Sequence, residues 1–176
     1  MLRRNMIPAL ALAVASLPLM AAPAVGQDLS RVERQIRREL VTLPFYGVFD
    51  NMTFRVDGSK VTLMGKVAHP VLKGDAGKVV KNIEGVQEVD NQIEILPVSS
   101  NDDRIRMAAY RAIYGHSTMT RYQTQAIPPI HIIVQNGNIE LEGVVATESE
   151  KTIAGVQAKG VIGEFSVKNN LLVEKN

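Results

Sequence analysis

Carboxylates and histidines are the side chains of this sequence that could transfer protons or bind a metal. Glu140 and Glu142 lie two residues apart on a predicted strand, so both project from one side, where paired carboxylates can act as acid and base. His69, His116 and His131 are too scattered for a metal pair, and the sequence holds no common metal, nucleotide or nucleophile motif. We therefore predict no enzyme activity, metal, cofactor or small-molecule substrate, and we interpret the two glutamates as a polar strand face.

The charge balance argues against a nucleic-acid partner. The 176 residues carry a formal charge of +2, from 20 Lys or Arg and 18 Asp or Glu. Arg3 and Arg4 are the only charged residues within 1–26, so the rest of the chain is neutral overall and has no basic field to attract DNA or RNA. Because the sequence contains no Cys, disulfides, thiolate metal sites and a Cys-linked lipid anchor are excluded.

The N-terminal segment has the features of a secretory signal peptide in their usual order. Arg3 and Arg4 precede an apolar stretch over 6–20, and small residues follow over 21–26. The apolar stretch is short for a membrane span, which needs about 20 apolar residues, although a retained membrane anchor is the alternative. The sequence therefore predicts a signal peptide over 1–26 that is cleaved, and a soluble periplasmic protein without a lipid anchor.

The remaining sequence contains one pattern written twice. VDGSKVTLMGKVA at 56–68 aligns with VQNGNIELEGVVA at 134–146, an offset of 78 residues, and 12 of 42 aligned positions are identical across the two copies. An upstream helix aligns at an offset of 73 residues, so the second copy carries five extra residues. Internal repetition of this kind predicts two small domains with one fold. We place domain 1 at 28–97, a linker at 98–101 and domain 2 at 102–175.

Each copy is expected to begin with an amphipathic helix followed by a β-hairpin. Val32, Ile36 and Leu40 recur at helical spacing and would form one buried stripe. Apolar residues then alternate on both sides of a turn sequence, which is Asp57-Gly58 in the first copy and Asn136-Gly137 in the second. This alternation predicts two half-buried antiparallel strands.

A second helix and a closing strand complete each copy. Pro70 suits the first position of the helix in copy one, whereas Thr147 and Glu150 form a capping-box sequence in copy two. Gly85 and Gly163 are predicted to end these helices. The closing strands are expected to direct three apolar side chains inward, namely Val89, Ile93 and Ile95 in copy one and Val167, Leu171 and Val173 in copy two.

Together these features resemble the BON domain, named after bacterial osmotically inducible periplasmic and nodulation proteins. In copy one the resemblance is carried by Val56, Gly58, Val61, Leu63, Gly65, Val67, Gly85, Val86, Val89 and Asn91. In copy two it is carried by Val134, Ile139, Leu141, Gly143, Val145, Gly163, Val167 and Asn169. The second copy departs from the pattern at Glu164-Phe165, where the usual valine after the glycine is missing.

The resemblance implies an α/β (α+β) fold of two tandem α-β-β-α-β sandwich domains, each a small three-stranded sheet covered by two helices. It also implies a non-enzymatic envelope protein that contacts phospholipid surfaces or envelope proteins, often under osmotic stress. Within this fold we interpret the glycine pairs as structural. Gly65 and Gly143 are expected to let a helix pack closely on a strand.

Cationic side chains gather on one side of both predicted helices of copy one. The candidate lipid-binding residues are Arg31, Arg34, Arg38, Lys73, Lys78 and Lys81. Each cation near an anionic lipid surface can contribute about 1 kcal/mol of binding free energy. The alternative is an ordinary solvated helix face, in which Glu33, Glu39 and Asp75 balance these charges.

Aromatic residues gather in the longer connection of copy two. The candidate protein-interface residues are Tyr110, Tyr114, Arg121 and Tyr122, because aromatic and Arg side chains are enriched at interfaces. The aromatic segment 43–49 is their counterpart in copy one. The alternatives are that these side chains cap the domain cores or enter a membrane interface.

Two functions therefore follow from the sequence. The first is a periplasmic protein of osmotic or envelope stress that binds anionic phospholipid or an envelope component. The second is a protein-binding or chaperone-like module that uses the aromatic loops or an exposed strand edge. Salt distinguishes them, because ions screen headgroup attraction but not an aromatic interface. The residues specify no oligomeric state.

Overall fold

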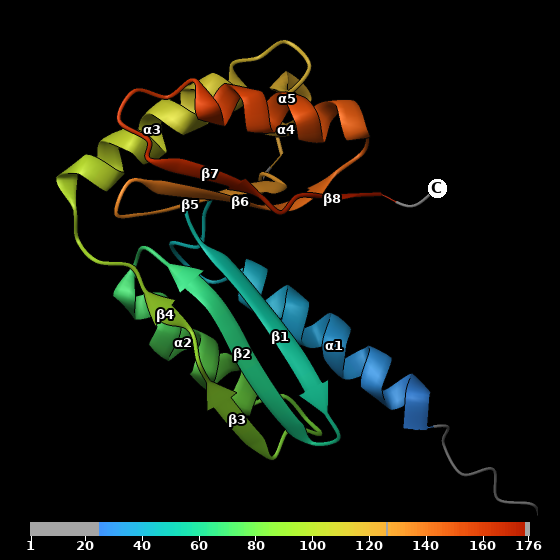
Figure 1. Cartoon of the computed structure of the whole chain (residues 1–176). Coiled ribbons are helices and arrows are strands. Elements are labelled where there is room, and N and C mark those ends of the chain that lie inside the picture. Colours follow the sequence, from blue (N-terminus) through green and yellow to red (C-terminus); the bar gives the residue numbers. More distant parts are fainter. Residues whose placement is uncertain (1–24, 126, 175–176) are drawn as a thin grey trace, which may run out of the picture.

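Figure 1 shows the computed structural model of the chain, which describes residues 25–125 and 127–174. Domain 1 contains α1 (Val25–Val41), β1 (Asn51–Asp57), β2 (Lys60–Val67), α2 (Pro70–Lys81), β3 (Glu88–Asn91) and β4 (Glu94–Ile95). Domain 2 contains α3 (Ser100–Tyr114), α4 (Thr120–Gln123), β5 (Ile130–Gln135), β6 (Asn138–Val145), α5 (Glu148–Lys159), β7 (Ser166–Asn169) and β8 (Leu172–Val173). Residues 1–24, which hold most of the predicted signal peptide, lie outside the described residues.

In both domains a central strand pairs with its hairpin partner on one side and with two short strands on the other. β2 pairs antiparallel with β1 and parallel with β3 and β4. β6 pairs in the same way with β5, β7 and β8. The parallel pairing requires a crossover, which α2 and α5 supply on the helical side of each sheet (Figure 1). The predicted α-β-β-α-β order is confirmed, with the last strand divided in two.

An asparagine side chain accounts for this division of the closing strand. Asn91 Nδ2 donates to Lys73 O at 2.6 Å, and the Ile93 N–H donates to Asn91 Oδ1 at 3.3 Å. Asn169 makes the equivalent bonds in domain 2. The break shifts the alternation of side chains, so Ile93 is buried whereas Ile95 is 46% exposed. The prediction that Ile95 faces inward is therefore wrong.

Each domain has its own apolar core between helices and sheet. In domain 1 the core contains Val32, Ile36, Leu40, Leu43, Val61, Leu63, Val67, Leu72, Ala76, Val80, Ile83 and Ile93, which confirms the predicted helical stripe. The domain 2 core includes Ile105, Ala109, Ile113, Ile132, Val134, Ile139, Leu141, Ala154 and Ala158. Domains this small bury only about 60% of their unfolded surface, so contact between them adds burial that each lacks alone.

Gly65 and Gly143 allow two strands, rather than a helix and a strand, to approach closely. Their φ angles are +117° and +119°. A Cβ atom on Gly65 would lie 2.1 Å from Asn51 O in the neighbouring strand, and one on Gly143 would lie 1.9 Å from Pro129 O. The expectation of helix packing at these glycines is therefore wrong, because the neighbour is backbone of the hairpin partner.

The helix ends also differ from the prediction. α2 ends at Lys81 and α5 at Lys159, before the glycines expected to end them. Gly85 and Gly163 instead have φ angles of +96° and +93° in the turns that lead into β3 and β7. Glycine suits these turns because other residues rarely adopt positive φ.

α3 begins earlier than the expected domain boundary. Its first residue, Ser100, lies within the segment 98–101 that the sequence suggests as a linker. The Ser99 side chain caps the helix by accepting a hydrogen bond from the Asp102 N–H at 3.2 Å. Among the described residues, no helix is both long enough and apolar enough to cross a membrane.

Candidate functional site

Arg31, Arg34 and Arg38 of α1 lie on the side of the helix that faces away from the sheet, whereas the Arg37 guanidinium lies 5.9 Å from the centroid of the Phe54 ring in β1. The apolar stripe of α1 is buried, whereas Arg31, Arg34, Arg37 and Arg38 are exposed. This separation follows from the helical spacing of the two residue types. α1 thus presents a cationic outer side to solvent.

α2 adds lysines to the same layer. α1 packs against α2 on one face of the domain 1 sheet, as Figure 1 shows. Lys78 and Lys81 are exposed, and Lys73 is half-buried. The structure therefore places the six candidate lipid-binding residues on two adjacent helices, and we call this set the cationic face: Arg31, Arg34, Arg38, Lys73, Lys78 and Lys81.

Acidic neighbours balance only part of this charge. Arg31 Nη1 lies 3.7 Å from Glu84 Oε2, and Lys78 Nζ lies 3.1 Å from Asp75 Oδ1. Exposed pairs of this kind contribute only about 0–1 kcal/mol, so they hold the cations weakly. Arg34 forms no ion pair with any residue whose side chain the structure describes. The cationic face can therefore exchange its partners for an external anion.

The tyrosines of α3 lie mainly inside domain 2. Tyr114 is fully buried, and its hydroxyl donates to Ile130 O at 2.6 Å and accepts from the Ile130 N–H at 3.1 Å. Burial raises the pKa of Tyr114 well above its ordinary value. Tyr110 is half-buried, with its ring centroid 5.0 Å from that of Tyr114. Tyr114 therefore joins the start of β5 to α3 and has no surface for a partner protein.

Tyr122 and Arg121 belong to a second internal cluster, centred on Glu150. The Tyr122 hydroxyl donates to Glu150 Oε2 at 2.9 Å, and Arg121 pairs with Glu150 Oε1. The N–H groups of Ala146 and Thr147 each donate to Glu150 Oε2 at 3.0 Å. Of the four candidate interface residues, only Arg121 is exposed. The three tyrosines pack mainly inside domain 2.

Domain 1 contacts domain 2 through the aromatic segment before β1. The Ile132 N–H of β5 donates to Val48 O at 2.7 Å, so this segment covers part of the free edge of β5. The Tyr46 ring lies 5.6 Å from the His131 ring, and Phe49 packs edge-on against Tyr110 at 6.3 Å between centroids. The segment 43–49 is therefore, in part, a contact between the two domains.

A buried carboxylate fixes the shape of this segment. Asp50 Oδ2 accepts the Gly47 N–H at 3.0 Å, and Oδ1 accepts the Ala68 N–H at 2.7 Å. Burial raises the pKa of Asp50 above its ordinary value, although these two hydrogen bonds oppose the rise. Burial and the charge of Asp50 raise the pKa of Tyr46 to about 12, and burial lowers that of His131. The two hydrogen bonds to Asp50 therefore hold the backbone of this segment in the shape in which it contacts domain 2.

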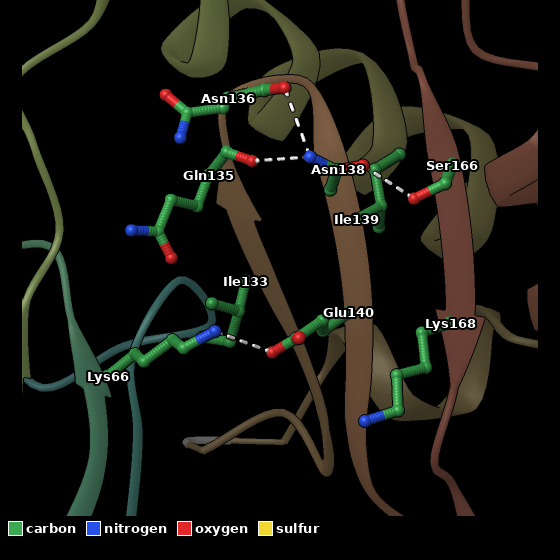
Figure 2. Close-up of a pocket in the computed structure, with 9 residues that line it drawn as sticks. All are labelled: Lys66, Ile133, Gln135, Asn136, Asn138, Ile139, Glu140, Ser166 and Lys168. Carbon is green, nitrogen blue, oxygen red and sulfur yellow. Dashed lines mark hydrogen bonds and ion pairs between the residues drawn. The ribbon is translucent and has the colours of Figure 1, made fainter.

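A polar cavity of about 470 Å³ lies where β2 of domain 1 meets the open face of the domain 2 sheet. Figure 2 shows Lys66 Nζ reaching Glu140 Oε2 at 3.0 Å across this boundary. Ser166 Oγ donates to Asn138 Oδ1 at 2.6 Å on the opposite side of the cavity. Lys168 also lines the cavity (Figure 2). Most of its polar groups are thus engaged with one another.

A larger groove of about 740 Å³ runs beside β1. Its lining includes the strand edge over 51–54, Glu33 and Arg37 of α1, and the apolar Val144 and Leu172 of domain 2. Within the described residues, no strand pairs with the outer edge of β1. The groove therefore combines an open strand edge with apolar and charged side chains.

Glu140 and Glu142, the paired carboxylates of the predicted strand, each have a polar partner. Glu140 pairs with Lys66, and Glu142 Oε1 accepts from Asn170 Nδ2 at 2.5 Å. His131 faces away from the domain 2 core, as its alternation predicts, but domain 1 covers it. Among the described residues, no group of His, Asp or Glu side chains could hold a metal ion.

Comparisons with known proteins agree with the repeated fold. The BON domain pattern matches residues 28–97 and 117–175, more than half of the chain. A relative is osmotically-inducible protein Y of Escherichia coli (strain K12), 28% identical over 132 residues, which are 69% of this chain and 61% of that protein. The chain thus spans less than two thirds of the length of that relative.

Two solved structures also match, both from CdsD, a structural protein of the type III secretion system of Chlamydia trachomatis. The first, of its C-terminal domain, is 14% identical, with a TM-score of 0.28 over 81% of this chain and 96% of that one. The second is 13% identical, with a TM-score of 0.30 over 82% and 92%. These low scores support no conclusion about function. The repeated α-β-β-α-β topology and the two pattern matches show that the chain belongs to the BON domain family.

Proposed function

We propose that this chain is an exported envelope protein that binds anionic phospholipid surfaces through the cationic face of domain 1. The observation that carries the proposal is the arrangement of that face, in which cations from α1 and α2 lie together on the outer helical layer. Weak, exposed ion pairs neutralise only part of this charge. The proposal includes a role in osmotic or envelope stress, which the name of the Escherichia coli relative supports.

The expected binding is electrostatic and reversible. Each cation close to an anionic membrane contributes about 1 kcal/mol, and the attraction falls off within a Debye length of about 10 Å at 0.1 M salt. A face of six cations therefore suffices for binding at low salt without a membrane-spanning helix. The periplasmic side of a bacterial membrane, reached after export, would supply such a surface.

Reversing two charges tests this proposal. In Arg34→Glu/Arg38→Glu, affinity for phosphatidylglycerol vesicles is expected to fall at least about twentyfold, because two attractive contacts are replaced by repulsive ones. Co-sedimentation of the mature chain, residues 27–176, at low salt measures the effect. The matched control is Arg55→Glu/Arg111→Glu, which makes the same change of charge at exposed arginines outside the cationic face. Equal losses in both variants would count against a localised lipid site.

A second candidate function is the capture of an extended protein segment by β1. The groove beside the open β1 edge supports it, because a peptide strand can add to such an edge while side chains fill the groove. Such binding would survive high salt and would not depend on Arg34 and Arg38, which do not line the groove. The charge-reversal variant therefore separates the two functions.

A further inference from the structure

The connection between α5 and β7 exposes two large apolar side chains at one end of domain 2. Ile162 is 88% exposed and Phe165 is 84% exposed. Figure 1 shows this connection at the same end of the domain as the start of α3 and the β5–β6 turn. Gly163, between the two residues, has a φ angle of +93° and turns the chain there. We call Ile162 and Phe165 the apolar tip.

The equivalent connection in domain 1 has the opposite polarity. At the repeat offset, Glu84 and Gln87 correspond to Ile162 and Phe165, and both are exposed. Val86, which is half-buried against the domain 1 core, corresponds to Glu164. Domain 2 therefore exposes apolar side chains where domain 1 exposes polar ones, on a turn of the same backbone shape.

The reversed polarity of the domain 2 connection is unusual because Glu164 lies partly inward. Its Oε2 atom is buried and has no hydrogen-bond partner among the described residues. A buried oxygen without a partner destabilises a fold, so this position of Glu164 lowers the stability of domain 2. Glu164 is half-buried, so part of the carboxylate of the loop is also withdrawn from the outer surface. An anionic partner would meet less repulsion there than at the domain 1 connection, where Glu84 is exposed.

Cations flank the apolar tip. Arg104 Nη2 would lie 3.3 Å from a Cβ atom on Gly163, so its guanidinium borders the loop. Lys159, in the last turn of α5, is exposed just before the loop. Apolar side chains within a cationic border suit a bilayer surface, where the former enter the acyl boundary and the latter meet anionic headgroups.

The size of the tip favours a lipid surface over a partner protein. Two side chains of this kind offer at most about 400 Å², whereas a stable protein interface buries about 800 Å² on each partner. A bilayer needs no complementary shape and accepts a convex apolar loop. We propose that the apolar tip inserts into the interfacial region of an anionic phospholipid bilayer. This inference rests on the proposed lipid-binding function and adds a second contact site, in domain 2.

A single tryptophan tests the insertion directly, because the chain contains no Trp. When the Phe165→Trp variant of the mature chain, residues 27–176, is mixed with vesicles of equal parts phosphatidylglycerol and phosphatidylcholine, its tryptophan emission is expected to shift to shorter wavelength. Brominated phosphatidylcholine in the vesicles is expected to quench it. Gln87→Trp, at the equivalent position of domain 1, is the matched control and is expected to show neither effect. Each substitution is at an exposed side chain, so the fold is expected to remain intact.

A second test replaces the two residues of the apolar tip by the residues at the equivalent positions of domain 1. Ile162→Glu/Phe165→Gln is expected to lower affinity for the same vesicles at least about tenfold, because apolar burial in the bilayer is lost. Val156→Gln, at a 59% exposed apolar residue of α5 outside the tip, is expected to bind like the unaltered chain. Far-UV circular dichroism checks that all variants are folded.

The outcomes separate this inference from the proposed function. Blue-shifted, quenched emission of Phe165→Trp together with weaker binding of Ile162→Glu/Phe165→Gln supports insertion of the tip. If the chain binds vesicles but the emission of Phe165→Trp stays unchanged, or the exchange variant binds normally, insertion is refuted while lipid binding stands. If the unaltered chain binds no anionic vesicle, the proposed function and the insertion are both refuted.

Discussion

Gly143→Ala is expected to destabilise domain 2 by more than about 3 kcal/mol. The alanine Cβ would lie 1.9 Å from Pro129 O, at a φ angle of +119°. The positive φ alone costs about 1–2 kcal/mol, and the contact is with backbone, which no rotamer change can relieve. Urea unfolding followed by circular dichroism measures the loss. Since small domains have a total stability of about 5–15 kcal/mol, partial unfolding at room temperature is within the expected range.

Gly74→Ala is the matched control for this prediction. Gly74 lies in α2, and a Cβ atom there would meet nothing within 4 Å. Because alanine favours helices over glycine by about 1 kcal/mol, this variant is expected to be as stable as the unaltered chain or slightly more so. A Gly143→Ala variant as stable as Gly74→Ala would contradict the strand contact described for Gly143.

Glu150→Gln is expected to destabilise domain 2 by about 2–4 kcal/mol. The carboxylate accepts hydrogen bonds from Tyr122 and from the N–H groups of Ala146 and Thr147, and it pairs with Arg121. A glutamine has one acceptor oxygen and an NH₂ group, so part of this cluster would lose its partner inside the protein. Thermal and urea unfolding measure the change. Glu148→Gln is the matched control, because Glu148 is exposed in the same helical turn.

The same variant is expected to change how stability depends on pH. Burial raises the pKa of Glu150, but the hydrogen bonds from Tyr122 and Thr147 and the charge of Arg121 outweigh it, so the pKa lies below its ordinary value of 4.5. A lowered pKa stabilises the fold above the unfolded pKa, and this contribution is lost as pH falls through the folded pKa. When the pH is lowered from about 5, the free energy of unfolding should therefore decrease less for Glu150→Gln than for the unaltered chain. Equal acid dependence in both chains would contradict the role given to Glu150.

The repeated pattern explains why most of the fold was predictable from the sequence. Two sequences that share 12 of 42 aligned positions must satisfy the same hairpin, crossover helix and closing strand. The turn at Asn136-Gly137, with φ angles of +53° and +77°, and the capping box at Thr147 both formed where local sequence chemistry placed them. These features depend on neighbours close in sequence.

Features that depend on distant residues were not predictable in the same way. The break in the closing strand depends on Asn91 bonding Lys73, 18 residues away, and nothing in the apolar alternation reveals it. The close neighbours of Gly65 and Gly143 are backbone atoms of another strand. For the same reason, sequence alone did not separate the buried Tyr114 and Tyr122 from interface residues.

The candidate surfaces also differ in whether neighbours close in sequence or distant residues determine them. The cationic face was predictable because helical spacing alone decides which side of α1 and α2 its residues occupy. The hydrogen bond between Val48 and Ile132 was not predictable from the sequence, because it joins two domains. The apolar tip had a partial signal in the missing valine at Glu164-Phe165, but only the structure shows that Ile162 and Phe165 face outward.

Vesicle co-sedimentation of the mature chain, residues 27–176, tests the central claim most directly. Vesicles of phosphatidylglycerol and vesicles of phosphatidylcholine are compared, each in about 0.05 M and about 1 M salt, since the Debye length falls to about 3 Å at 1 M. We predict binding to phosphatidylglycerol at low salt, strongly weakened at high salt, and little binding to phosphatidylcholine. Absence of binding to either vesicle, or equal binding to both at every salt concentration, would contradict an anionic-lipid function for the cationic face.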